Sequence, residues 1–213
     1  MREMKFIIFL SVAFIGFTLL FSGIRFHFWW QMAGTAGGLA CTVILYDPEL
    51  RRQLIGNGRR ESGYRKRIWT EIGLGILSAA VLYIIFWIGN SLSRLVFGFA
   101  SSGISSVYEF KTGTPVWVIA LLIALIIGPA EEIVWRGMIQ SRVTERAPRW
   151  VWIHAAFLYS MAHLGSLNLM LILAALVCGL FWGWMYQRFR SLRMNMVSHV
   201  IWDMLVFLVL PFK

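Results

Sequence analysis

Residues 6–24 read FIIFLSVAFIGFTLLFSGI, and residues 26–46 read FHFWWQMAGTAGGLACTVILY. Neither stretch contains Lys, Arg, Asp or Glu, and each has about the twenty residues that a helix needs to cross a bilayer. The whole chain follows this pattern, because 59% of its 213 residues are hydrophobic and 14% are charged. An average soluble domain has about a quarter of its residues charged. The sequence therefore predicts an all-α, multi-pass membrane protein.

Seven such spans account for most of the chain. We expect them at residues 6–24, 26–46, 68–90, 114–140, 150–164, 168–187 and 194–211. Helices of this number and length leave no room for a soluble domain of ordinary size, so residues 1–213 form a single transmembrane domain in this interpretation. The pattern predicts a polytopic bundle of about seven helices, whose function lies within the membrane or at its surface.

The formal charge of +10 follows the alternation of these spans. Most of the 20 Lys and Arg residues lie at the N-terminus or in the segments 47–67, 142–149 and 188–193. By the positive-inside rule, this distribution predicts a cytoplasmic N-terminus, a basic cytoplasmic loop at 47–67 and a C-terminus outside the cell membrane. Topology and lipid headgroups then explain the basic residues, and we do not expect nucleic acid as a partner.

The connections and the glycines give weaker signals. Residues 91–113 mix Phe and Leu with a Ser-Ser-Gly cluster, which predicts an interfacial helix or a loop on the outer side. Residues 165–168 supply turn chemistry between the fifth and sixth spans. Two pairs of glycines have the spacing that permits close contact between membrane helices: Gly34/Gly38 and Gly179/Gly183.

Ionisable residues inside the spans are the candidates for function, because a charged group at depth in a bilayer costs a few kcal/mol or more. They are Glu71, Glu131, Glu132, Arg136, Asp203, His27, His154, His163 and His199. Glu71 lies four residues after Arg67, so an ion pair at the helix end explains it. We interpret His27 and His154 as interfacial residues. The remaining candidates all lie in the last four spans.

The fourth span contains GPAEEIVWRG at residues 128–137. Pro129 cannot donate to the carbonyl group four residues earlier, so we expect a kinked or opened helix just before the two acids. Glu132 and Arg136 lie one turn apart and are natural ion partners, whereas Glu131 points about 100° away from Glu132. The spacing therefore leaves Glu131 as the unpaired carboxylate.

The fifth and seventh spans carry further polar groups. Tyr159 lies one turn before His163 on the same face of the fifth span. Asn195, His199 and Asp203 recur every four residues and form a polar stripe on an apolar helix. With a rise of about 1.5 Å per residue, these groups and the fourth-span acids can meet. They would form a site in the inner half of the membrane, open to the cytoplasm.

Three patterns occur in this order on successive helices: Glu131-Glu132-x-x-x-Arg136-Gly137, Tyr159-x-x-x-His163 and His199-x-x-x-Asp203. Together they resemble the three motifs of the CAAX protease and bacteriocin-processing family. These intramembrane glutamic endopeptidases include the type II CAAX prenyl endopeptidase. The resemblance covers residues 114–211, which we expect to be the catalytic core. Tyr159 stands where the family pattern has Phe, and Asp203 stands where the prenyl endopeptidases have Asn.

The resemblance implies catalytic roles for four residues. Glu131, hydrogen-bonded to His163, would activate a water for attack on a peptide bond. His199 and residue 203 would stabilise the oxyanion. An ionised Asp203 offers no hydrogen-bond donor, so either it is protonated, or it orients His199 while the imidazolium stabilises the oxyanion.

The other motif residues would support this site rather than react. They are Glu132, Arg136, Tyr159 and Asn195. Of these, Glu132 and Arg136 would hold the helix end that presents Glu131. The resemblance thus implies a membrane-embedded peptidase that needs no metal or other cofactor and acts on a membrane-associated peptide or protein. Whether that substrate is lipidated stays open.

Two alternatives to this interpretation stay open at the level of sequence. The first is a zinc-dependent protease, because four residues offer oxygen and nitrogen ligands for zinc: Glu131, His163, His199 and Asp203. The second is a non-enzymatic membrane factor, such as a bacteriocin self-immunity or partner-binding protein, or a transporter with a proton-relay glutamate. An immunity factor would keep working after Glu131→Gln.

Overall fold

The structure is a computed structural model that describes residues 3–22, 27–55, 63–144 and 150–212. Within these ranges the chain is helical and has no strand, which confirms the all-α prediction. The α-helices and the short 3-10 or π segments, labelled η, follow in this order: α1 (Glu3–Phe21), α2 (Phe28–Tyr46), α3 (Pro48–Ile55), α4 (Tyr64–Val96), α5 (Ala100–Tyr108), η2 (Glu109–Lys111), α6 (Val116–Leu122), η3 (Ile123–Ile127), α7 (Gly128–Glu132), η4 (Ile133–Gln140), α8 (Ser141–Thr144), α9 (Val151–Met161), η5 (Leu164–Ser166), α10 (Leu169–Phe189), α11 (Leu192–Met204) and η6 (Leu205–Val209).

Five helical segments of the described chain are long and apolar enough to cross a membrane. They are Met4–Phe21, Tyr64–Val96, Val116–Val143, Leu169–Phe189 and Leu192–Val209. Each coincides with a predicted span, so the protein is a multi-pass membrane protein. The predicted span at 26–46 is the 19-residue helix α2, whose Gly, Trp and Gln residues lower its mean hydropathy.

The predicted span at 150–164 is a shorter element than expected. Helix α9 has 11 residues, or about 16 Å at 1.5 Å per residue, whereas the hydrocarbon core of a bilayer is about 30 Å thick. After α9 the chain turns through η5 into α10, and the side chain of Asn168 caps α10 by accepting from two backbone N–H groups. The turn predicted at 165–168 is therefore confirmed. It leaves His163 buried just beyond the end of α9.

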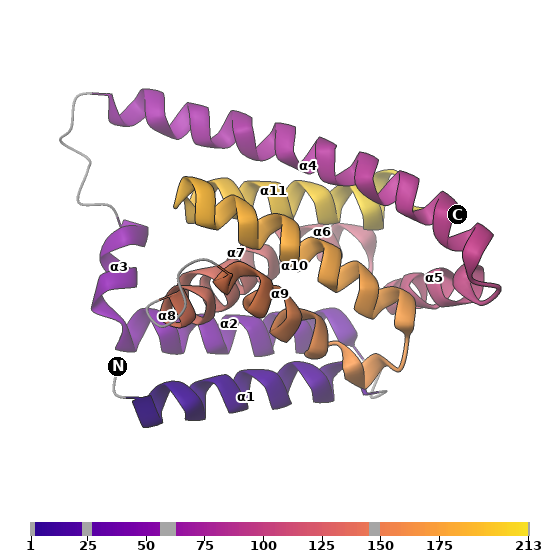
Figure 1. Cartoon of the computed structure of the whole chain (residues 1–213), viewed down its shortest axis with the longest axis horizontal. Helices are drawn as coiled ribbons and strands as arrows, with labels where there is room; N and C mark the ends of the chain where they lie inside the picture. Colours follow the sequence, from indigo (N-terminus) through magenta and orange to yellow (C-terminus); the bar gives the residue numbers. More distant parts are fainter. Residues whose placement is uncertain (1–2, 23–26, 56–62, 145–149, 213) are drawn as a thin grey trace.

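The helices run back and forth, so that the basic segments gather at one end of the bundle (Figure 1). Helix α3, the start of α4, helix α8 and the connection from α10 to α11 lie at this end, on the left of Figure 1, while α5 and the C-terminus lie at the opposite end. The basic segment 47–67 contains the helix α3, and its residues 56–62 lie outside the described chain. The segment 91–113, predicted as an interfacial helix or a loop, is mostly helical.

Glycines permit two of the close helix contacts that bring the polar residues together. A Cβ atom on Gly128 of α7 would lie 2.7 Å from Cγ2 of Val200 on α11. A Cβ atom on Gly179 of α10 would lie 2.9 Å from Cα of Ala156 on α9, which confirms the predicted contact there. Only glycine allows backbones this close. The prediction is wrong for the other pair, where an added Cβ would meet no atom of the described residues within 4 Å: Gly34 and Gly38.

Candidate active site

The polar residues selected from the sequence come from three parts of the fold. The segment formed by α7 and η4 carries Glu131, Glu132 and Arg136. Tyr159 lies at the C-terminal end of α9 with His163 just beyond it, and α11 carries Asn195, His199 and Asp203. All of them are buried, with exposed fractions between 0% and 7%. Buried ionisable groups in a membrane protein need partners, and the contacts below supply them.

The helix that carries the two acids is irregular on both sides of them. The five residues of α7 lie between two π-helical segments, η3 and η4. Pro129 is part of α7 and cannot complete the ordinary α-helical ladder. The opened helix that we expected before the acids is therefore present as the π segment η3. Such π segments are frequent at functional sites.

Glu132 is the central acceptor of a buried network. Arg136 donates from Nη1 to Glu132 Oε1 at 2.9 Å, which confirms the predicted ion pair. Nδ1 of His199 lies 2.8 Å from the same oxygen, and the Asn195 amide donates to Oε2 at 3.1 Å. Glu132 thus connects its own helical segment to α11. From the sequence, only the partner within its own helix was predicted.

Aromatic rings enclose Arg136 and His199. The guanidinium carbon of Arg136 lies 4.9 Å from the ring centroid of Tyr159 and 5.4 Å from that of Trp182. Trp182 also stacks on His199, with ring centroids 4.0 Å apart. These cation–π and stacking contacts help to fix both groups. Trp182 could not be selected from the sequence, because one Trp among the many in apolar spans carries no distinguishing signal.

Glu131 lies outside this network. Its Oε2 accepts a hydrogen bond from the hydroxyl of Tyr159 at 2.9 Å. Among the described residues it makes no ion pair, although the Tyr159 hydroxyl makes it less isolated than predicted. The expected hydrogen bond between Glu131 and His163 is absent from the part of the chain that the structure describes. Instead, Nδ1 of His163 lies 2.9 Å from the carbonyl oxygen of Tyr159, so Tyr159 connects the two.

The tautomer of His163 follows from this contact. A carbonyl oxygen can only accept, so Nδ1 of His163 carries the proton and donates it to Tyr159. In the neutral imidazole, Nε2 is then an acceptor. The ring lies against Phe21 of α1, with centroids 4.4 Å apart. The imidazole of His163 is thus fixed by its contacts with Tyr159 and Phe21, and its Nε2 remains able to accept a hydrogen bond.

Asp203 is a looser neighbour of His199 than the sequence suggested. Its Oδ2 lies 3.5 Å from Nε2 of His199, which is longer than an ordinary hydrogen bond. The close carboxylate partner of His199 is Glu132, 67 residues away in the chain. Glu132 therefore orients the imidazole, and Asp203 adds a nearby carboxylate.

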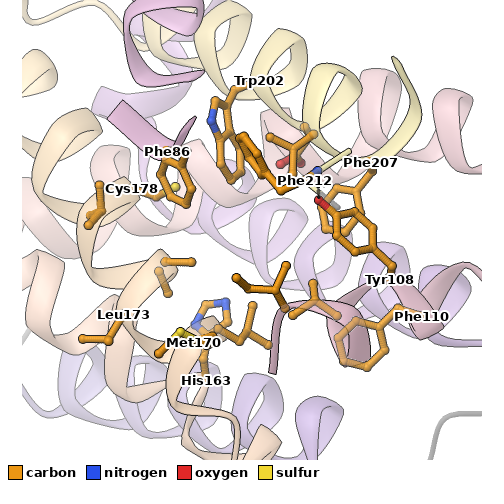
Figure 2. Close-up of a pocket in the computed structure, with 18 of the residues that line it drawn as sticks. Phe86, Tyr108, Phe110, His163, Met170, Leu173, Cys178, Trp202, Phe207 and Phe212 are labelled. Carbon is orange, nitrogen blue, oxygen red and sulfur yellow. Dashed lines mark hydrogen bonds between the residues drawn. The ribbon is translucent and has the colours of Figure 1, made fainter. Parts of the chain in front are cut away.

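Some of the site residues line a cavity of about 350 Å³, and the others do not. The side chains that line it are Glu131, Tyr159, His163, His199 and Asp203. Three other site residues do not line the cavity: Glu132, Arg136 and Asn195. Two of them contact residues that do, because Glu132 contacts His199 and Arg136 contacts Tyr159. The rest of the wall is mainly apolar and aromatic. Figure 2 shows His163 and Met170 on one side of the cavity and Phe86 and Trp202 on the other.

The cavity extends from the acids toward the α5 end of the bundle. Its wall includes the C-terminal half of α4, helix α5 and Phe212, which lie away from the basic end (Figure 1). Ile85 of α4 and Leu173 of α10 also line it and are 41% and 37% exposed, so both side chains contact the cavity and the outer surface. The expected opening toward the basic end finds no support, because this cavity leads in the other direction.

The zinc alternative requires ligands that converge on one point. Within the described ranges, no group of three or more His, Cys, Asp or Glu side chains is arranged to hold a metal ion. The four residues considered as zinc ligands therefore do not form a ligand set in this arrangement: Glu131, His163, His199 and Asp203.

The other ionisable residues found in the sequence lie apart from the cavity. Glu71 pairs with Arg67 at 3.2 Å, as predicted, and also with Arg193 of α11 at 2.5 Å, which the sequence did not indicate. His27 and His154 are exposed and do not line the cavity. The helix-end ion pair predicted for Glu71 is therefore confirmed, and the interfacial location of His27 and His154 stays a prediction.

The fold and the site define a multi-pass helical membrane protein with acids and imidazoles around an internal cavity. Residues 112–205 match the family model described as type II CAAX prenyl endopeptidase Rce1-like. This region contains all of the site residues, and the match confirms the resemblance seen in the motifs. Residues 112–205, somewhat less than half of the chain, are therefore similar to the CAAX protease family, and this similarity supports a peptidase with a peptide or protein substrate. Comparisons with curated proteins and with solved structures gave no match.

Proposed function

We propose that the protein is an intramembrane endopeptidase of the glutamic type, in which Glu131 and His163 activate the attacking water. One observation carries the proposal. Glu131, His163 and His199 come from three separate helical segments, and their side chains line the same cavity. They also belong to the three sequence patterns that resemble the family motifs, and all three patterns lie within the matched region.

Glu131 is the proposed general base. One of its carboxylate oxygens accepts from Tyr159, which leaves the other for a water in the cavity. As the water oxygen attacks the peptide carbonyl carbon, one water proton passes to Glu131. Nε2 of His163 can accept the second hydrogen bond of the same water and so orient it. The proton on Glu131 then passes to the leaving amine as the carbon–nitrogen bond breaks.

His199 is the proposed donor to the oxyanion. Its Nδ1 contacts Glu132, and Asp203 lies near its Nε2. Two neighbouring carboxylates favour the imidazolium form, in which Nε2 also carries a hydrogen. That hydrogen can be donated to the negative charge that develops on the carbonyl oxygen. Arg136 balances the charge of Glu132, so the pair can remain buried.

The cavity suggests the class of substrate. Its aromatic and apolar wall fits a membrane-associated peptide or protein with a bulky apolar group, a lipid or large side chains, near the scissile bond. We propose that this segment enters from the bilayer between α4 and α10. The scheme uses a carboxylate and imidazoles alone and assigns no step to a metal. By the positive-inside rule, we also propose that the basic end and the N-terminus are cytoplasmic and the C-terminus outside.

Cleavage of a quenched-fluorescence peptide library by purified protein in detergent tests the proposal. Glu131→Gln and His163→Ala should each lower turnover by about 10²–10⁴-fold, the range for loss of a catalytic acid or base. His199→Ala should lower it by about 10²–10³-fold, the range for loss of an oxyanion donor. Far-UV circular dichroism should show that the variants remain folded. His154→Ala is the matched control, because this exposed imidazole lies on α9 away from the cavity. Wild-type turnover in all three site variants would contradict the proposal.

A further inference from the structure

We infer that Tyr159 is a positioning residue that aligns the proposed base Glu131 with its imidazole partner His163. The inference rests on the proposed function and adds a role for a group that the family motif lacks. The pattern that this chain resembles has Phe at this position, so the hydroxyl is a departure from the pattern. The structure shows where that hydroxyl points.

Tyr159 contacts both partners through different groups. Its hydroxyl donates to Glu131 Oε2 at 2.9 Å, and its backbone carbonyl accepts from Nδ1 of His163 at 2.9 Å. The rings of Tyr159 and His163 also meet edge to face, with centroids 5.0 Å apart. Because the described structure has no direct hydrogen bond between Glu131 and His163, Tyr159 is the residue that relates their positions.

The tyrosine ring is itself held in place. It is 6% exposed and packs edge to face against Trp135, with centroids 5.1 Å apart. The guanidinium group of Arg136 lies over its face at 4.9 Å. A ring fixed on both sides fixes the direction of its hydroxyl, and so the position of the carboxylate that accepts from it. Such preorganisation keeps reacting groups in a productive geometry.

The hydroxyl also acts on the charge of Glu131. A donor to a carboxylate favours the ionised form, which is the form that can act as a base. The other charged or titratable groups that face Glu131 are Glu132, Arg136, His163, Cys178, His199 and Asp203. Arg136 and a charged His199 favour a negative Glu131, whereas the carboxylates of Glu132 and Asp203 oppose it. The Tyr159 hydroxyl also favours the negative form of Glu131, so it should extend activity to lower pH.

The variant Tyr159→Phe tests this inference, because it removes only the hydroxyl and recreates the family pattern. The pH profile of kcat should keep its shape while its acidic limb moves up by about one pH unit. Turnover on the acidic side should fall about tenfold, with KM nearly unchanged. The matched control is Tyr186→Phe. Tyr186 is equally buried on α10, but its hydroxyl meets that of Ser141 at 3.2 Å and does not line the cavity.

The outcomes separate the inference from the proposed function. An unmoved acidic limb in Tyr159→Phe, with Glu131→Gln inactive, would overturn the inference and leave the proposed function standing. The same shift in Tyr186→Phe would also overturn it, because the effect would then be general to the fold. Full activity of Glu131→Gln would instead overturn the proposed function. A shift confined to Tyr159→Phe supports the inference.

Discussion

Replacing Arg136 by Leu should strongly destabilise the protein, because it removes the arginine partner of the buried Glu132 carboxylate. The side chains of Arg136 and Glu132 are 3% and 0% exposed, and the ion pair between them measures 2.9 Å. Removing one partner of such a buried pair costs about 3–5 kcal/mol of the free energy of unfolding. His199 and Asn195 still donate to Glu132, so we expect a loss near the lower end of this range.

Unfolding by SDS titration in mixed micelles measures this loss. The control is Arg52→Leu, which removes the pair between Arg52 and Glu49, at 62% and 64% exposure. Exposed pairs contribute at most about 1 kcal/mol, so this variant should be almost as stable as the wild type. Adding Glu132→Gln to Arg136→Leu removes the unbalanced charge and should recover part of the loss. Equal losses for the buried and the exposed pair would show that burial does not set the cost of removing an ion-pair partner.

Three further predictions concern residues around and beyond the site. Asp203→Asn should keep cleavage within about tenfold of wild type, because Asp203 lies 3.5 Å from the His199 imidazole and an amide can donate in its place; complete loss in the peptide assay would speak against this. Burial opposes the charge of Asp47, but hydrogen bonds from backbone N–H groups of α3 and from Arg142 outweigh this effect. They lower the pKa of Asp47 below the usual 3.8. Asp47→Asn should therefore lower the free energy of unfolding at pH 7, and the difference should vanish in acid as the pH falls through the pKa of the folded state; a difference independent of pH would be inconsistent with this. Gly179→Val should separate α10 from α9, because its Cβ would lie 2.9 Å from Ala156, and should lower both thermal stability and turnover; an unchanged melting temperature would count against it.

The parts of the site that lie within one helix could be predicted from the sequence. The pair of Glu132 and Arg136 and the shared face of Tyr159 and His163 both follow from the helical repeat of about 3.6 residues. The spans follow from the length of apolar runs. These features depend on local geometry, so the sequence and the structure agree on them.

The contacts between helices could not be predicted in the same way. Glu132 contacts His199 across 67 residues, and this contact depends on how α7 and α11 are rotated about their axes. Spacing within one helix does not specify that rotation, which comes from packing such as that at Gly128. The direction of the cavity likewise depends on where α4 and α5 lie relative to α11. The sequence therefore indicated which residues could meet, and the structure shows which of them do.

The proposed role of Glu131 is tested most directly by peptide cleavage with wild-type and Glu131→Gln protein, each with and without excess chelator. With this role, wild-type cleavage should resist the chelator, and cleavage should fall by about 10²–10⁴-fold in the variant. Cleavage that the chelator abolishes, or that persists undiminished in Glu131→Gln, would contradict it.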